Sequence, residues 1–200
     1  MPDVDRRKFV TTLLARVERG DDDAVGELFD VVYAELRGLA ASQLARERAG
    51  HTLQPTALVH EAWLKLQGSS LTVADRDHFV GIAARAMRQV LVDHARRRAT
   101  DKRGHGWEQT TLGTGDMSVA FDPHELLDLD RALERLDERQ RRVVELRFFA
   151  GLEERDVARL LGVTERTVRR DWVKARAWLY AELYPDDASP SPESPEPEGG

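Results

Sequence analysis

The chain has 200 residues, of which 41% are hydrophobic and 33% charged, and it contains no cysteine. The lack of cysteine excludes a disulfide framework and a thiolate metal site. The length allows one large domain or two small ones. No apolar run approaches the ~20 residues of a membrane span, and residues 1–23 lack the continuous apolar core of a signal peptide. We therefore expect a cytoplasmic protein without a membrane span.

The net charge of −6 conceals an uneven distribution of charged residues. Residues 85–103 hold seven basic and two acidic side chains, a net of +5, and residues 162–178 hold five and two, a net of +3. Residues 186–200 contain five acids and no base. Because salt limits electrostatic attraction to short distances, each basic segment can attract nucleic acid even within an acidic chain.

Apolar residues recur at helical spacing through most of the first hundred residues. The pattern predicts four helices, over residues 5–19, 21–48, 55–67 and 78–98. We expect Phe9 on the buried side of the first helix, which Gly20 ends, and Pro55 in the first turn of the third. Asp77 is the predicted cap of the long fourth helix, whose arginines should form a charged, solvent-facing side.

Helical periodicity fails over residues 99–121, which hold several glycines and few apolar residues in register. We interpret this stretch as a flexible linker between a first domain at residues 5–98 and a second at residues 122–184. Residues 185–200 are too polar and too rich in proline to bury a core, so we expect a disordered acidic tail. No segment alternates apolar and polar residues as strands do. The sequence therefore predicts an all-α fold of two small helical domains.

The second domain opens with a clear helix start, in which Asp122 is the cap and Pro123 the first helical residue. Asp137 with Gln140 three positions later repeats this signal for a helix that runs through Phe149. Both helices lead towards the segment with the most specific pattern in the chain.

Residues 153–183 have the pattern of a helix-turn-helix motif. The first helix ends at Gly162, where glycine accepts the left-handed conformation, and Thr164 can cap the second helix. Val168 begins an apolar stripe that leaves a basic side facing outward. The outward side chains suited to base edges and phosphates in a major groove are Arg166, Thr167, Arg169, Arg170 and Lys174. An ordinary helical hairpin with a solvated basic face fits the same spacing.

Nothing in the sequence indicates an enzyme. His60 and Glu61 begin like the HExxH zinc motif, but Leu64 stands where the second histidine is required. The six histidines show no ligand spacing, and no glycine-rich phosphate loop follows a strand. We therefore expect no catalysis, no metal site and no cofactor.

Four blocks of sequence, in order and spacing, resemble a known family. They are LFDVVYAELRGLA, PTALVHEAWLKL, HFVGIAARAMRQVLVDHARRRATDKRG and ALERLDERQRRVVELRFFAGLEERDVARLLGVTERTVRRDWVKARAWL. Together they are similar, over residues 5–183, to the extracytoplasmic-function (ECF) sigma factors of bacterial RNA polymerase. The chain resembles the compact members of that family, which have only the second and fourth sigma domains.

The resemblance implies a sigma factor that binds core RNA polymerase and directs promoter-specific initiation of transcription. In the family, the fourth domain reads the −35 element as duplex DNA, which assigns that role to the outward side chains of the second motif helix. The second domain melts the −10 element, and its long basic helix holds the adjoining duplex and the displaced strand. The residues at the matching positions are Arg85, Arg88, Gln89, Asp93, Arg96, Arg97 and Arg98.

The resemblance also implies that residues 55–67 dock on the largest polymerase subunit, with contacts from His60, Glu61 and Lys65. On the residues alone, these three side chains fit a plain solvated helix face. Many relatives carry an acid where this chain has Ala57. The loop at residues 68–77 matches the loop that captures a flipped base but has no aromatic residue to stack on it. An anti-sigma protein is a further candidate partner.

A stand-alone helix-turn-helix regulator is the alternative to a sigma factor. Such a regulator binds a palindromic operator as a dimer and does so without polymerase. The arginine-lined helix in the first domain favours the sigma factor, because a sensing or dimerising domain has no need of a second DNA-binding surface.

Overall fold

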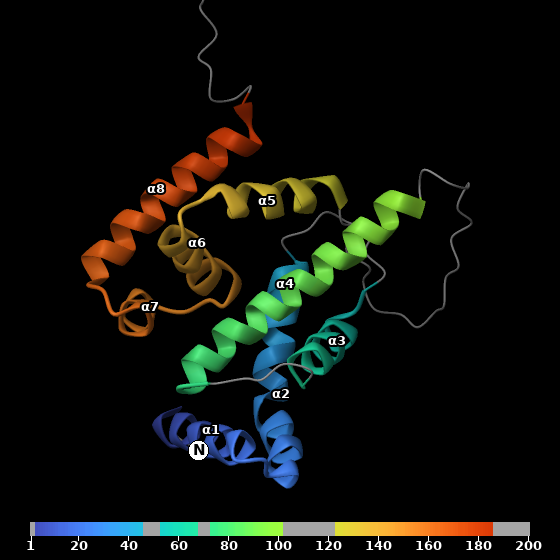
Figure 1. Cartoon of the computed structure of the whole chain (residues 1–200), viewed down its shortest axis with the longest axis vertical. Helices are drawn as coiled ribbons and strands as arrows, with labels where there is room; N and C mark the ends of the chain where they lie inside the picture. The colour runs from blue at the N-terminus through green and yellow to red at the C-terminus, as the bar shows by residue number, and fades with distance from the viewer. Residues whose placement is uncertain (1–2, 46–52, 68–72, 102–122, 186–200) are drawn as a thin grey trace, which may run out of the picture.

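In the computed structural model of the chain, residues 3–45, 53–67, 73–101 and 123–185 are described. They form helices, with no β-strand among them, which confirms the predicted all-α fold. The elements are α1 (Asp3–Glu18), α2 (Asp22–Leu44), α3 (Pro55–Gln67), α4 (Arg76–Asp101), α5 (Pro123–Arg135), α6 (Glu138–Val144), the π-helical turn η1 (Glu145–Phe149), α7 (Glu154–Leu161) and α8 (Glu165–Leu183) (Figure 1). The predicted acidic tail from residue 186 onwards, most of the predicted linker and residues 68–72 of the predicted base-capture loop lie outside the described residues.

Several predicted helix starts and stops are confirmed. Gly20 and Gly162 have φ values of +85° and +64°, in the left-handed region that favours glycine because it has no Cβ. The Asp137 side chain caps α6 by accepting a hydrogen bond of 2.8 Å from the backbone N–H of Gln140. Pro55 is the first residue of α3. These local signals were therefore sufficient to place the ends of these helices.

The start of α4 differs from the prediction, because Asp75 rather than Asp77 provides the capping carboxylate. The backbone N–H of His78 donates to Asp75 Oδ1 at 2.9 Å. The helix begins at Arg76, so Asp77 already lies inside its first turn. The Asp77 side chain, only 4% exposed, pairs instead with arginines from other elements.

The buried side of α1 is narrower than predicted. Val10, Leu13 and Leu14 are at most 6% exposed, whereas Phe9 is 42% exposed. The stripe that packs on the rest of the molecule therefore passes beside Phe9, which was wrongly expected to be buried.

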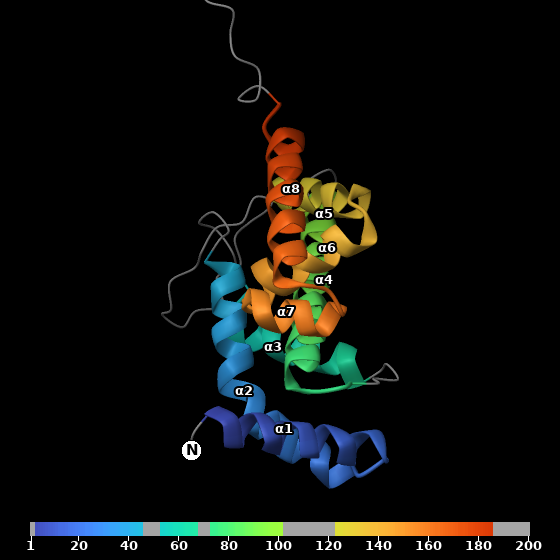
Figure 2. The ribbon, with the colours of Figure 1, turned by 90° about the vertical axis from the view of Figure 1, so that its left-hand side faces the viewer.

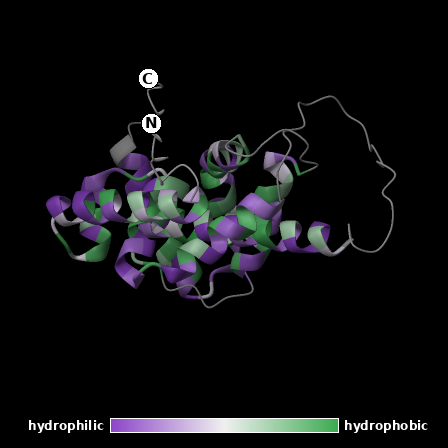
Figure 3. Cartoon of the chain, turned by 90° about the horizontal axis from the view of Figure 1, so that it is seen from above, coloured by the Kyte–Doolittle hydropathy of each residue, from purple (hydrophilic) through white to green (hydrophobic). Residues whose placement is uncertain are grey.

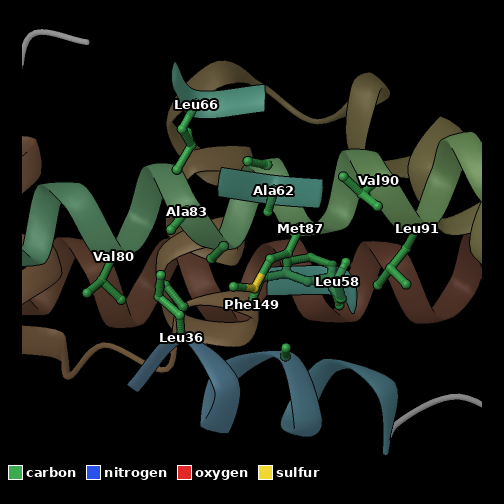
Figure 4. Close-up of a cluster of buried hydrophobic side chains, with 14 of the residues drawn as sticks. Leu36, Leu58, Ala62, Leu66, Val80, Ala83, Met87, Val90, Leu91 and Phe149 are labelled. Carbon is green, nitrogen blue, oxygen red and sulfur yellow. The ribbon is translucent and has the colours of Figure 1, made fainter. Parts of the chain in front are cut away.

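Helix α4 is the central element, and it runs between α1–α3 on one side and α5–α8 on the other (Figures 1 and 2). Its contacts with α3 and α5 are among the most extensive in the molecule. Buried residues surround it, and in Figure 4 Met87 of α4 lies with Leu58 of α3, Leu36 of α2 and Phe149 of η1. The residues predicted as two domains thus contribute to one continuous core around α4.

A second, smaller core holds the helix-turn-helix together. Its buried members come from α6, η1, α7 and α8. They are Val143, Leu146, Val157, Ala158 and Val168. Hydrophobic and hydrophilic residues alternate along the helices (Figure 3), as expected when each helix has one buried side. Because this core packs against one side of α8, it fixes the orientation of the helix and therefore which of its side chains face solvent.

Candidate nucleic-acid interface

The turn between α7 and α8 has the geometry that the sequence predicts. After Gly162, the backbone N–H of Val163 returns to the carbonyl of Ala158 at 3.0 Å, which closes the end of α7. Thr164 Oγ1 accepts a hydrogen bond of 3.2 Å from the backbone N–H of Thr167, which caps α8. Val168 is fully buried beneath this turn. The motif is therefore a tightly packed unit with a fixed second helix.

The side chains predicted to read the −35 element lie mostly on the outer side of α8. Arg166 and Lys174 are exposed, and the side chains of Arg169 and Arg170 are 66% and 57% exposed. Thr167 is half-buried, and its hydroxyl lies 3.0 Å from that of Thr164. The structure thus brings four long cationic side chains to one accessible surface, while Thr167 also contributes to the cap.

Glu154 on α7 holds one of these cations in place. Its Oε2 accepts hydrogen bonds from Nη2 and Nε of Arg169, at 2.8 and 3.2 Å. Its Oε1 accepts from Arg147 at 2.7 Å, and the Arg147 guanidinium lies over the Trp172 ring, 5.0 Å from its centroid. The hydrogen bond from Arg169, with the charges of both arginines, lowers the pKa of Glu154 below its usual value. Arg169 is therefore oriented by a network that spans both helices of the motif.

Asp171 lies beneath the exposed side of α8 and anchors two more arginines. It is 2% exposed, and its carboxylate accepts from Arg139 at 2.6 Å and from Arg170 at 3.3 Å. Burial by itself raises the pKa of Asp171, but the hydrogen bonds and charges of Arg139 and Arg170 outweigh burial, and the net pKa is lowered. The ionised Asp171 side chain therefore holds Arg139 and Arg170 in place on the basic surface.

One arginine of the basic side of α4, Arg88, does not face solvent as predicted. Arg88 is only 6% exposed, because α5 and η1 lie across it. Its Nη1 donates to Asp130, its Nη2 donates to Glu145 at 3.1 Å, and its guanidinium lies 5.7 Å from the centroid of the Phe149 ring. The second half of the chain therefore covers a residue predicted to contact the −10 element.

The other residues predicted for the −10 element are distributed along the exposed edge of α4. Arg85 and Arg97 are exposed, whereas Gln89 and Arg98 are half-buried. Arg96 is 61% exposed and still donates to Asp130, at 3.2 Å. A polar pocket of about 330 Å³ between α4, α5 and α6 is lined by several of these residues. They are Arg85, Arg88, Gln89, Asp93 and Arg96.

The predicted docking residues of α3 lie on two sides of that helix. Glu61 accepts from His94 Nε2 at 3.0 Å, and Lys65 donates to Asp93 at 3.0 Å, so both lie along the seam with α4. His60 lies on the side towards α2, with its ring 5.5 Å from the Phe29 ring. Between them, Leu64 is 67% exposed, the most exposed of the large apolar side chains in the described residues. The exposed part of α3 is thus mixed in character rather than purely charged.

The chain matches the family model of the ECF sigma factor over residues 7–185. The match extends across both halves and includes both arginine-rich helices. The chain belongs to the ECF sigma factor family. As a family member it is a DNA-binding sigma factor that acts in transcription initiation, with core RNA polymerase and promoter DNA as its partners. A search of curated proteins found no match.

Sequence reasoning about this sigma factor missed the acids that face α4. Asp130 is 8% exposed and Glu145 is 5% exposed. Asp130 stands four residues after Leu126 and three before Leu133, within the apolar stripe of α5. An acid at such a position requires a buried cation, and this signal could have predicted a partner for Asp130. Nothing in the sequence names Arg88 as that partner.

Across the described parts of this sigma factor, no helix combines the length and apolar character that crossing a bilayer requires. The same residues contain no group of three or more histidine, aspartate or glutamate side chains placed to hold a metal ion.

Proposed function

We propose that this sigma factor directs core RNA polymerase to promoters by reading the −35 element with α8 and holding the melted −10 element with α4. The observation that carries this proposal is the outward surface of α8, where four long cations lie on a helix fixed by a dedicated core. Such a helix fits the major groove, where arginines recognise guanine edges and phosphates through bidentate hydrogen bonds. Glu154 and Asp171 support the proposal because they accept hydrogen bonds from Arg169 and Arg170 and so orient both arginines before DNA binds.

The role proposed for α4 rests on its guanidinium groups and on the pocket beside them. Single-stranded DNA is held by cations that follow its backbone, and Arg85, Arg96 and Arg97 lie along one helix at exposed positions. For α3 we propose polymerase docking through its exposed Leu64 with Glu61 and Lys65 beside it. An apolar anchor with charged neighbours is a common arrangement at protein interfaces.

The test is run-off transcription with bacterial core polymerase, with and without this protein, from the promoter upstream of its own gene. Salt concentration is fixed and stated, because binding to phosphates falls steeply with salt. We expect a transcript that depends on the protein and is lost when Arg169 and Arg170 are both replaced by Ala. Arg131→Ala is the matched control, since Arg131 is an exposed arginine on α5, paired with Asp128 and distant from the motif in sequence.

If the protein binds the upstream DNA alone, as a dimer on a palindrome, and no transcript depends on it, the chain acts as a stand-alone regulator. If the transcript depends on the protein but survives the double substitution, α8 does not read the upstream element.

A further inference from the structure

A polar cavity of about 330 Å³ lies where α5 and α6 approach the middle of α4. Helix α5 packs directly on α4, and α6 follows α5 in the chain (Figures 1 and 2). Ligand sites of proteins measure about 300–1,000 Å³. The cavity is therefore large enough for a small molecule.

The lining of this cavity is strongly polar. Five basic and four acidic side chains contribute to it. Of the described residues that line it, only Val92 and Leu133 are apolar, and none is aromatic. Because proteins usually hold the bases of nucleotides by stacking them on aromatic rings, the cavity does not suit a nucleobase. Its chemistry suits a small, charged and hydroxylated ligand.

Most of the charged side chains in the lining already have partners within the protein. Three of the five cations are paired with three of the four acids, and these ion pairs are Lys65–Asp93, Arg88–Asp130, Arg88–Glu145 and Arg96–Asp130. Arg88 has a carboxylate on each of its terminal nitrogens, and its Nε is buried. These paired residues therefore form the wall of the cavity and are not available to a ligand.

Two guanidinium groups and one carboxylate of the lining have no partner among the described residues. The guanidinium groups belong to Arg85 of α4, which is exposed, and to Arg141 of α6, which is half-buried. The carboxylate belongs to Glu134 of α5, which is exposed. Two unpaired cations against one unpaired acid leave an excess of positive charge beside the cavity. The lining thus offers hydrogen-bond donors that lack an acceptor.

The backbones that carry the two arginines are anchored in the core. Ala86, next to Arg85, is 5% exposed, and Val143, two residues after Arg141, is fully buried. The cap from Asp137 also fixes the start of α6. Binding to groups on fixed helices costs less conformational entropy than binding to groups on loops. The cavity is therefore largely formed before a ligand arrives.

From this arrangement we infer that the cavity binds a small phosphorylated sugar, with the phosphate held between Arg85 and Arg141. Guanidinium groups offer planar, paired donors that match the oxygens of a phosphate. Glu134 and the amide of Gln89 line the same cavity, and both side chains can accept hydrogen bonds from hydroxyl groups. The site thus offers donors for the phosphate and acceptors for the hydroxyl groups of one ligand.

This ligand site goes beyond the proposed function and does not rest on it. Neither Arg141 nor Glu134 has a role in promoter binding there. Arg85 is common to both, so a bound phosphate would occupy a guanidinium that the proposed function assigns to the −10 element. Binding of the sugar phosphate is measured without DNA or polymerase. Its failure and the failure of the proposed function are therefore separate results.

The first test titrates the full-length protein with ribose 5-phosphate by isothermal titration calorimetry at constant ionic strength. Inorganic phosphate and ribose are titrated in parallel. We expect saturable binding of one ribose 5-phosphate per chain, and affinity lower by about tenfold for phosphate, which lacks the hydroxyl groups. We expect no binding of ribose. Absence of saturable binding of ribose 5-phosphate overturns the inference, and equal affinity for inorganic phosphate overturns the assignment of a sugar.

The second test compares two neighbouring arginines of α6. Arg141→Ala should lower the affinity for ribose 5-phosphate by about tenfold or more, because it removes a charged donor to the phosphate. Arg142→Ala is the matched control, since Arg142 is also half-buried on α6 but does not line the cavity. Equal losses of affinity in the two variants would show that only the charge of the helix matters, which overturns the inference.

A third variant keeps this test informative if Arg141→Ala disturbs the fold. Arg85→Ala changes an exposed position on α4, and we expect it to weaken ribose 5-phosphate and inorganic phosphate by the same factor. A helical circular dichroism spectrum establishes that each variant is folded. Wild-type affinity for both titrants in a folded Arg85→Ala variant overturns the inference.

A fourth variant tests the part of the site assigned to the hydroxyl groups. Glu134→Ala should reduce the preference for ribose 5-phosphate over inorganic phosphate, because it removes an acceptor for hydroxyl groups and leaves both arginines in place. Glu138→Ala is its control, since Glu138 is an exposed acid of α6 that does not line the cavity. An unchanged preference in Glu134→Ala overturns the assignment of a sugar to this site.

Discussion

Helices α4 and α8 each carry several arginines, but these arginines have different surroundings. On α4, Arg88 is 6% exposed and shared by two carboxylates from the other half of the chain. On α8, the side chains of Arg169 and Arg170 are more than half exposed, and their carboxylate partners belong to the same helical motif. A run of arginines thus indicates where positive charge occurs, whereas the neighbouring elements decide whether DNA can reach it.

The largest expected effect is a loss of stability that affects α4 and spares α8. Arg88→Ala leaves Asp130 and Glu145 buried without their shared cation, and we expect the free energy of unfolding to fall by about 3–5 kcal/mol. Arg166→Ala, at an exposed position, should change it by less than about 0.5 kcal/mol. Urea unfolding followed by tryptophan fluorescence measures both. Equal losses of unfolding free energy in the two variants would show that the difference in burial between Arg88 and Arg166 does not affect stability.

Affinity for duplex DNA should depend on the exposed arginines of α8, whereas stability depends on the buried Arg88 of α4. Replacing Arg169 and Arg170 by Ala removes two exposed guanidinium groups, each worth about 1–3 kcal/mol when it makes a bidentate contact to a base. We expect at least a tenfold loss of affinity for the upstream duplex, measured by fluorescence anisotropy, with little change in stability. Arg131→Ala serves as the control, and a similar loss in that variant would indicate that only overall charge matters.

The proposed docking surface on α3 is intermediate in exposure between Arg88 and the arginines of α8. Its Glu61 side chain is 41% exposed and paired with His94. Glu61→Arg should weaken binding to core polymerase by about tenfold through charge complementarity and leave affinity for the upstream duplex unchanged. Loss of the Glu61–His94 pair itself should lower stability by no more than about 1 kcal/mol. Normal run-off transcription from this variant would remove α3 from the docking surface.

The smallest expected effect is the weakening of the ion pair between Asp75 and Arg159 at acidic pH. Burial raises the pKa of Asp75, but the His78 backbone hydrogen bond and the Arg159 side chain outweigh it, so the net pKa lies below 3.8. A carboxyl group whose pKa is lower in the folded state than in the unfolded state stabilises the fold. This stabilisation is complete when the pH is above the unfolded-state pKa, and it is lost as the pH falls through the folded-state pKa.

We therefore expect this contact to be constant between about pH 5 and 8 and to weaken only below about pH 4. The contribution should be below about 1 kcal/mol, since Arg159 is half exposed. Unfolding measured against pH, with Asp75→Asn as the comparison, tests this expectation. A difference between the two proteins that shrinks as pH rises from 5 to 8 would contradict it.

Local signals in the sequence were enough to predict the helices and the motif. Glycine at a left-handed position ends a helix wherever it occurs, and a side-chain oxygen caps a helix from three residues away, so Gly162, Thr164 and Asp137 act through their immediate neighbours. Reliance on these local signals also explains why the cap of α4 was wrongly predicted. Asp75 and Asp77 are both acids near one helix start, and choosing between them required the position of the first turn.

The sequence by itself determined the all-α fold, the helix-turn-helix, the outward basic side of α8 and the family resemblance, because periodicity and capping are properties of contiguous residues. Only the tertiary structure decided that Asp130 and Glu145 cover Arg88, which lies 42 and 57 residues away from them in the chain. A buried acid reveals that it needs a cation. Which cation it finds depends on how whole helices pack, and no pattern of neighbouring residues encodes that choice.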